Sequence, residues 1–306
     1  MSPRLAAIAL ALGAGAAQAQ PHPMPKPDPH AAVATSAARY QAFDAAGEAL
    51  PLDQMLDEAV AVDVVFIGEI HNDPTAHAIE SEVLAGLVRR AGARQVVLAM
   101  EMFDADVQTV LDEYIAGLIS ERDFLDAARP WANYADAYRP LVEFAKAHGL
   151  RVVATNAPVR YVRALARGEA LAGLSPEALG WLPALPVAPP SAATADAFAA
   201  VMGRMASGGG SPLLDAQNLR DASMAYHTAK ALRAPGRPLV VHVNGGFHTE
   251  GGRGIPEHLT RFAPDARTFL IAVDPVPDIG VAPDAAGNDA VVQTDARLLS
   301  SPTGTR

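Results

Sequence analysis

The stretch Val64-Val65-Phe66-Ile67-Gly68-Glu69-Ile70-His71 decides the fold of this chain. A continuous apolar run ends abruptly in a glycine, a carboxylate and an imidazole. A short apolar run of this kind predicts a buried β-strand. In open α/β sheets, ligands bind beyond the carboxyl ends of the strands. We therefore expect Glu69 and His71 to lie at a functional edge of a sheet.

A second stretch repeats this pattern far downstream. The β-branched run Leu239 to Val243 leads into Gly245-Gly246-Phe247-His248. Both runs thus end in a Gly-x-x-His motif. Glycine permits sharp turns and close ligand approach at such points, so His248 becomes the second candidate histidine.

A third strand supplies another carboxylate. Gln95 to Met100 is apolar and ends in Glu101, and the helical pattern of Pro74 to Arg90 separates it from the first strand. Strands joined by one helix are usually parallel neighbours with a right-handed crossover. We therefore expect the two strands to be adjacent, with Glu69 and Glu101 at the same edge.

The other elements follow from periodicity and from glycine and proline positions. Residues 174–211 are less regular and predict a helical insertion or lid, residues 36–275 form a single domain, and residues 276–306 are a peripheral tail. On the last long helix Gln217, Arg220, Asp221 and Met224 share one face, which could rim a pocket. The remaining predicted helices are 51–61, 105–118, 121–128, a helix ending at His148, 215–232 and one ending at Phe262, and the remaining strands are 150–155 and 268–273.

The N-terminus predicts export. Arg4 precedes the apolar run Leu5 to Ala17, and a small-x-small cleavage site ends at Ala19, which predicts a signal peptide over residues 1–19. Residues 20–35 are proline-rich and predict an extended linker. We expect a periplasmic or secreted protein. The apolar run is too short for a permanent membrane anchor.

Composition limits the chemistry. The chain has 306 residues, 50% of them hydrophobic, which is enough for one large α/β domain. It contains no cysteine, so disulfides, thiolate metal ligands and a cysteine nucleophile are excluded. The formal net charge of −10 makes nucleic acid an unsuitable partner.

Four residues at the ends of the predicted strands could perform catalysis: Glu69, His71, Glu101 and His248. Of these, His71, Glu101 and His248 could hold a borderline divalent metal ion with positions left for water or substrate. The sequence has no Gly-x-Ser-x-Gly elbow and no His-Glu-x-x-His motif, so serine hydrolase and zincin chemistry lack support.

Taken together, the motifs resemble the ChaN-like family of haem-binding uptake proteins, of the wider group with Tiki proteases, TraB-type proteins and erythromycin esterases. The resemblance extends from about Val64 to Leu259. It is carried by Gly68 to Pro74 with His77, Ala99 to Asp104, Tyr138 to Leu141, Asn156 to Pro158, Leu219 to Asp221, Gly246 to His248 and Gly254 to Pro256.

The resemblance implies a three-layer α/β/α sandwich with a mainly parallel central sheet, and a haem or iron ligand. It suggests the Tyr138 phenolate as the iron ligand with a histidine as partner, and aromatic cover from Phe103, Trp131 and Tyr134. The residues that could contact haem or its propionates are His77, Arg139, Arg160 and Arg220. A homodimer is an arrangement that the resemblance allows.

Three functions stay open at this point. The first is haem or iron binding in uptake or handling outside the cytoplasm. The second is a divalent-metal-dependent hydrolase, a peptidase or esterase that uses both Gly-x-x-His motifs and Glu101. The third is a periplasmic interaction module whose polar strand edge is vestigial. The alternative to a haem-binding role for Tyr138 and Trp131 is that both side chains only pack in the core.

Overall fold

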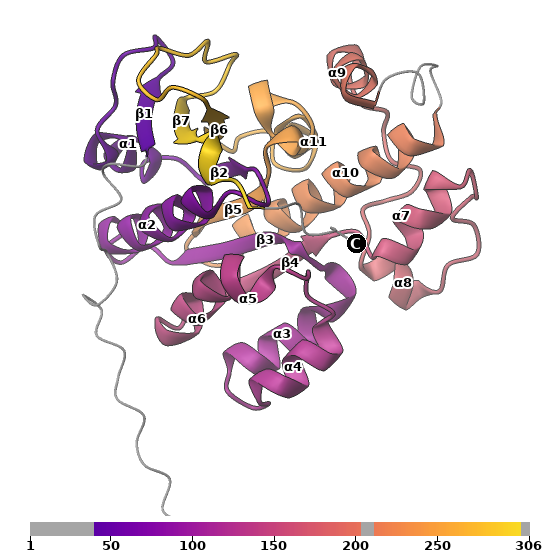
Figure 1. Ribbon diagram of the computed structural model, residues 1–306. Coiled ribbons are helices and arrows are strands. Elements are labelled where there is room, and N and C mark those ends of the chain that lie inside the picture. The colour runs from indigo at the N-terminus through magenta and orange to yellow at the C-terminus, as the bar shows by residue number, and fades with distance from the viewer. Residues whose placement is uncertain (1–39, 203–210, 301–306) are drawn as a thin grey trace, which may run out of the picture. The chain divides into compact units, whose positions relative to one another are not determined.

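A computed structural model describes residues 40–202 and 211–300 (Figure 1). The predicted signal peptide and linker lie outside these residues. A seven-stranded sheet has the order β1-β7-β6-β2-β5-β3-β4, and every pair is parallel except β1 with β7. The strands are β1 (Tyr40–Asp44), β2 (Val64–Glu69), β3 (Val96–Asp104), β4 (Arg151–Asn156), β5 (Leu239–Gly245), β6 (Thr268–Val276) and β7 (Ala290–Asp295).

The helices occupy both faces of this sheet, with further helices beyond its β4 edge (Figure 1). They are α1 (Leu52–Ala59), α2 (Pro74–Arg90), α3 (Gln108–Ile115), α4 (Glu121–Ala128), α5 (Tyr134–Ala137), α6 (Arg139–Ala147), α7 (Val159–Ala166), α8 (Pro176–Gly180), α9 (Ala192–Met202), α10 (Pro212–Leu232) and α11 (Ile255–Phe262). The sequence pattern predicted α2 and α4 with the observed bounds.

Alternating side chains divide the core into two layers. In β2, Val65 and Ile67 pack in the cluster that contains α1 to α6, whereas Val64 and Phe66 pack in the cluster with α10 and α11. Successive side chains of a strand point to opposite faces, so an all-apolar strand needs cover on both sides. The α/β/α sandwich and its mainly parallel sheet are therefore confirmed.

One predicted neighbour relation is wrong. β2 and β3 do not pair, because β5 lies between them and is parallel to both. The seven residues of β5 are all buried, and such a strand is most stable at the centre of a sheet covered on both faces. This strand order affects the site, because the end of β5 lies between Glu69 at the end of β2 and Glu101 on β3.

The C-terminal segment also differs from the prediction. Residues 276–306 were expected to be peripheral, but β7 pairs with β6 and β1, and five of its six residues are buried. Its Thr294 donates a hydrogen bond to the buried Asp73 carboxylate. Proline and glycine residues before β7 obscured this short strand in the sequence.

In its described part, the predicted insertion, residues 174–211, contains the helices α8 and α9, joined by irregular structure. Leu174, Leu182 and Val187 pack with α7 and α10, and a Glu257 carboxylate of α11 accepts hydrogen bonds from Ser191 and Thr194 near the start of α9. No residue of 174–202 lines the cavity described below. A role as a lid stays a prediction.

None of the helices in the described ranges combines the length and apolarity that crossing a bilayer requires.

Candidate functional site

The first Gly-x-x-His edge holds a histidine with one free nitrogen. His71 Nδ1 donates to Glu69 Oε1 at 2.6 Å, and the Tyr138 hydroxyl donates to the same oxygen at 2.9 Å. The His71 side chain is 31% exposed, while the Glu69 side chain is buried. Within the described part of the chain, Nε2 of His71 has no hydrogen-bond partner. This nitrogen is available for a ligand.

The surroundings also set the basicity of His71. Burial favours the neutral ring, but the hydrogen bond to Glu69 and the charges of Glu69 and Glu101 outweigh it, so the pKa of His71 is raised. Asn133 donates to the His71 carbonyl at 2.9 Å, and the Trp131 ring lies edge-on to the imidazole at 4.8 Å between centroids. These contacts fix the direction of the ring.

The second Gly-x-x-His edge holds a histidine between two carboxylates. His248 Nε2 lies 3.3 Å from Glu101 Oε1, and its Nδ1 is hydrogen-bonded to Asp221 of α10. The amide of Gln217 lies 3.0 Å from the same Nδ1. Burial lowers the pKa of His248, but the charges of Glu101 and Asp221 together raise it to about 10. His248 is therefore an imidazolium at neutral pH.

Glu101 joins the two edges. Its Oε2 accepts the backbone N–H of Gly245 at 2.7 Å. Burial would raise the pKa of Glu101, but the charge and hydrogen bond of His248 and the charge of His71 lower it well below the usual range. Glu101 is thus a charged, fully buried carboxylate facing two histidines.

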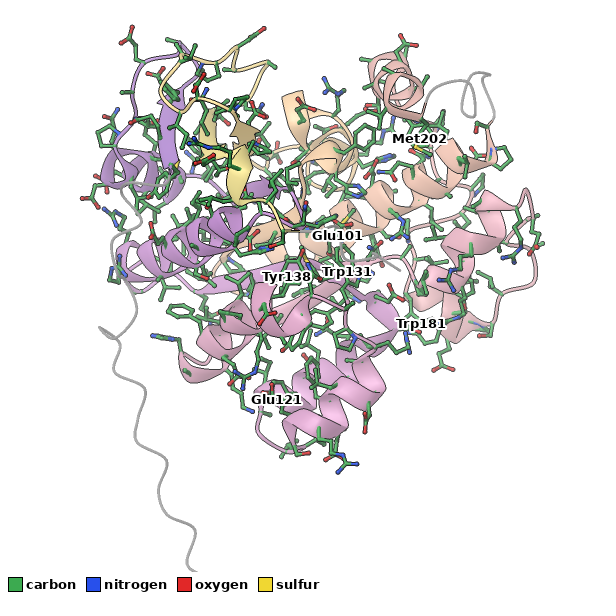
Figure 2. All side chains as sticks on the ribbon, viewed as in Figure 1. Glu101, Glu121, Trp131, Tyr138, Trp181 and Met202 are labelled. Atoms are coloured by element: carbon green, nitrogen blue, oxygen red, sulfur yellow. The ribbon has the colours of Figure 1, made fainter. Side chains whose placement is uncertain are left out.

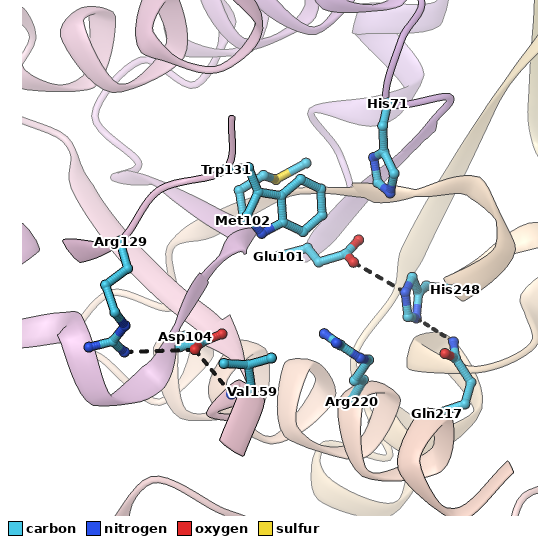
Figure 3. Close-up of a pocket in the computed structure, with 10 residues that line it drawn as sticks. All are labelled: His71, Glu101, Met102, Asp104, Arg129, Trp131, Val159, Gln217, Arg220 and His248. Carbon is cyan, nitrogen blue, oxygen red and sulfur yellow. Dashed lines mark hydrogen bonds and ion pairs between the residues drawn. The ribbon is translucent and has the colours of Figure 1, made fainter. Parts of the chain in front are cut away.

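These groups face a cavity of about 220 Å³ (Figure 3). His71 enters from the end of β2, Glu101 from β3 and His248 from beyond β5, while Trp131 and Met102 form an apolar wall. The other lining residues are Asp104, Arg129, Val159, Gln217 and Arg220. The predicted functional edge is therefore one pocket with two differently held histidines.

Arg220 brings an unpaired cation to this cavity. Its guanidinium points into the space that Glu101 and His248 also face (Figure 3). Among the described residues Arg220 has no hydrogen bond and no ion pair, although its charge opposes the rise that burial causes in the pKa values of Asp104 and Asp221. An unpaired guanidinium beside a cavity can bind a carboxylate or phosphate in bidentate geometry.

Other sequence-predicted contacts lie elsewhere. Tyr138 is fully buried beneath His71, and burial together with the charge of Glu69 raises its pKa far above the ordinary value. The phenolate expected from the resemblance is therefore not available in this conformation. His77 is hydrogen-bonded to Glu80 at 3.2 Å and contacts the Tyr138 ring, so it lies behind the cavity wall.

Two of the three predicted arginines are engaged away from the cavity. Arg139 pairs with Glu121 on the surface of the molecule, well away from Glu101 (Figure 2). Arg160 pairs with Asp106 and stacks over Trp181. Both Glu121 and Trp181 lie at the periphery in Figure 2, whereas Trp131 and Tyr138 lie near Glu101.

The aromatic cover also differs from the expectation. Trp131 lines the cavity, but Phe103 and Tyr134 are buried in the core and contact Phe124. Sequence reasoning did not assign Met102, Asp104 and Arg129 to the site. For Met102 and Asp104 the sequence did offer a clue: both lie within three residues of Glu101, and β3 continues to Asp104.

The polar face predicted on the 215–232 helix does rim the pocket. Gln217 and Arg220 line the cavity, and Asp221 binds His248 from behind. The metal set His71, Glu101 and His248 is less compact. Across the described ranges, the one group of three His or acidic residues with donor atoms all within 4.8 Å of one another is Glu69, His77 and Glu80.

The fold and this site define an α/β/α protein with a polar ligand site at the carboxyl edge of a mainly parallel sheet. The chain matches the model of the family described as haem-binding uptake, Tiki superfamily, ChaN, over residues 55–259, and it belongs to that family. The family expectation from the sequence is thereby confirmed.

A solved structure shares the fold, and a curated protein is similar in sequence. A structure titled as cofacial heme binding to ChaN of Campylobacter jejuni has a TM-score of 0.60 and 16% identity, covering 83% of this chain and 96% of that chain. Protein RETICULATA-RELATED 5, chloroplastic, of Arabidopsis thaliana is 24% identical over 233 residues. The match covers 69% of this chain but only 31% of that protein.

Proposed function

We propose that this protein binds haem at the mouth of the cavity, where Nε2 of His71 would hold the iron, in haem or iron uptake or handling outside the cytoplasm. One observation carries the proposal: a histidine beside the cavity has Nδ1 fixed by a buried carboxylate, while its Nε2 has no partner among residues 40–202 and 211–300. Membership of the ChaN family supports haem as the ligand.

The donor chemistry suits this role. A metal-binding histidine usually donates its other ring N–H to a carboxylate or carbonyl, which fixes the tautomer and makes the ligating nitrogen more basic. Glu69 supplies that carboxylate to His71 at 2.6 Å. Histidine is also a common protein ligand of haem iron. When bound, haem would supply the iron, and the protein would supply a ligating nitrogen from His71.

The cavity can hold only part of a porphyrin. Its volume of about 220 Å³ is below the roughly 300–1,000 Å³ of pockets that enclose a drug-sized ligand. The macrocycle would therefore remain partly exposed, with Trp131 and Met102 as apolar contacts. Arg220, which lacks a partner among the described residues, suits a propionate carboxylate.

The choice of His71 over Tyr138 is a testable one. Titration of the purified protein with haemin should give a Soret shift that His71→Ala removes, with affinity reduced by more than about 100-fold, because even second-shell changes at metal sites cost 10–100-fold. Tyr138→Phe should keep most of the binding, since it removes only one of two hydrogen bonds to Glu69. His148→Ala, on an exposed histidine, is the matched control.

A reversed pattern would contradict the ligand assignment. If Tyr138→Phe abolishes the Soret shift and His71→Ala retains it, then the phenolate is the ligand and the site rearranges on binding. Absence of any Soret shift with the unaltered protein would reject haem binding itself.

A proton competes with iron for His71 Nε2. Since the pKa of His71 is raised, haemin affinity should fall as the pH is lowered through that raised pKa.

Arg220→Gln should weaken haemin binding about tenfold, the value of one charge-assisted contact of about 1.4 kcal/mol. The same change should leave binding of the haemin dimethyl ester unaltered, because the ester has no carboxylate to pair.

The cellular role rests on the predicted signal peptide and on the family. Cell fractionation should find the mature chain outside the cytoplasm, and the mature N-terminus should lie near Gln20. A cytoplasmic protein with an intact N-terminus would remove the uptake role but not haem binding.

Hydrolysis in the same cavity is a second candidate, favoured by the pairing of His71 with the imidazolium of His248 across one space. Nε2 of His71 could activate water, alone or beside a divalent ion, while His248 stabilises developing negative charge. Hydrolysis of chromogenic ester and peptide substrates, with and without Zn²⁺, tests this function. The candidate fails if Glu101→Gln keeps all of the activity that the unaltered protein shows above background.

A further inference from the structure

We propose that Glu69, His77 and Glu80 form a second, buried site for a divalent transition-metal ion, behind the wall of the cavity. Each residue offers one ligand atom, and these atoms all lie within 4.8 Å of one another. None of the three lines the cavity. The proposal does not require haem, although Glu69 is common to both sites, since its Oε1 accepts the hydrogen bond from His71.

Local structure places the three ligands together. His77 and Glu80 lie three residues apart in the first two turns of α2, where side chains at i and i+3 share a face. Glu69 is the last residue of β2, and the connection from β2 to α2 is short. The strand end therefore faces the first turns of the helix, and the carboxylates come from two rigid elements.

The carboxylates carry unused buried oxygens. The side chains of Glu69 and Glu80 have no exposed surface, and that of His77 is 11% exposed. Oε2 of Glu69 and Oε1 of Glu80 are buried without a hydrogen-bond partner among residues 40–202 and 211–300. Each of these carboxylates uses only its other oxygen, Glu69 with His71 and Tyr138, Glu80 with His77.

A cation would satisfy both orphaned oxygens at once. Burying an unpaired carboxylate oxygen costs several kcal/mol unless it meets a proton donor or a metal. A single ion held by both carboxylates, with the side chains turned so that the unpartnered oxygens face it, would remove both penalties and take the imidazole as its third ligand. His77 is the most exposed of the three, so it provides the route by which an ion reaches the site.

The ligand set selects the kind of ion. One imidazole and two carboxylates suit Zn²⁺ or Mn²⁺, whereas Mg²⁺ and Ca²⁺ prefer oxygen ligands only. No thiolate competes in this cysteine-free chain. In a zinc site with bonds near 2.0–2.1 Å the ligand atoms lie roughly 3.4 Å apart, so the side chains must close slightly from the observed spacing.

Zinc binding to the full chain tests this site. After dialysis against a chelator, calorimetric titration with ZnCl₂ should show one tight equivalent and a higher Tm. His77→Gln and Glu80→Gln should each weaken that equivalent by more than about 100-fold, since even changes beyond the ligand shell cost 10–100-fold. His148→Ala, on a surface histidine, should retain it.

Two further variants separate this site from other sources of zinc binding. Glu101→Gln alters the cavity and should leave the tight equivalent in place. His22→Ala with His30→Ala removes the N-terminal histidines and should also leave it. The proposal is overturned if His77→Gln and Glu80→Gln both retain the equivalent, or if the unaltered chain binds no zinc. In the second case a shared proton, rather than a metal, satisfies the two carboxylates.

Discussion

The two Gly-x-x-His edges have the same local sequence pattern but opposite electrostatic roles. At the β2 edge, His71 has one carboxylate partner, Glu69, and keeps Nε2 free and partly exposed. At the β5 edge, His248 is 9% exposed in its side chain and has a carboxylate at each nitrogen. The number of carboxylates, and not the motif, decides which histidine can accept a ligand.

The partners also come from different distances along the chain. Glu69 lies two residues before His71, so the first pair forms within one strand end. Asp221 and Glu101 lie 27 and 147 residues from His248, on α10 and β3. A local pair leaves the ring at the surface, whereas partners from two elements enclose it.

The largest expected effect follows from removing one partner of the enclosed histidine. Asp221→Ala should lower the free energy of unfolding by about 3–5 kcal/mol, because it leaves a buried imidazolium with one counter-charge. Urea denaturation measures this loss. Asp215→Ala, an exposed acidic residue on the same helix, should cost less than about 1 kcal/mol.

A similar loss in both variants would contradict this difference between the edges, since it would mean that the Asp221–His248 pair stabilises the fold no more than a solvated charge does.

The second-largest expected effect is a pH dependence of stability that comes from His248 at the β5 edge. The pKa of His248 in the folded state is about 10, above the unfolded value of roughly 6.5. The folded state therefore holds a proton that the unfolded state releases. The resulting stability is complete below about pH 6.5 and is lost as the pH rises toward 10, with a slope of up to about 1.4 kcal/mol per pH unit.

His77, with a pKa raised to about 9, acts in the same direction. Urea denaturation at pH 7, 8 and 9 tests the slope, and the NMR titration of the His248 imidazole assigns its share. Stability that stays constant from pH 7 to 9 would show that His248 is neutral in the folded protein.

The smallest effect concerns the close contact between the two edges. A Cβ added at Gly245 would lie 2.9 Å from His71 Cε1, whereas one added at Gly246 would have no neighbour nearer than 3.6 Å. Gly245→Ala should therefore displace the partly exposed His71 ring and weaken haemin binding about tenfold, or roughly 1.4 kcal/mol. Gly246→Ala is the matched control and should bind haemin normally.

Equal haemin affinity in the two glycine variants would show that His71 has room to move, or that it is not the ligand.

The sequence predicted the strands that carry the site and the residues at their ends. Glu69, His71, Glu101 and His248 follow apolar runs, and alternation or continuity of apolar residues is a local property that the sequence displays directly. The polar face of α10, with Gln217, Arg220 and Asp221, is also readable from helical spacing. The resemblance to the ChaN family that the sequence displays was carried by motifs that include most of these residues.

Strand order and side-chain partners required the tertiary structure. Nothing local to β2 and β3 shows that β5 separates them, because that order depends on contacts between residues more than 100 positions apart. β1 and β7 were missed for the same reason, since short strands gain their stability from pairing with each other.

The tertiary structure also decides which polar residues can act as ligands. Tyr138 has the phenol that ferric iron would accept, but its burial beneath Glu69 keeps it protonated. Arg139 is next to it in sequence and pairs with Glu121 instead. The sequence by itself determined which polar residues end the central strands. Only the folded structure determined which of them keeps a free atom, because burial and charge pairing depend on residues distant in the chain.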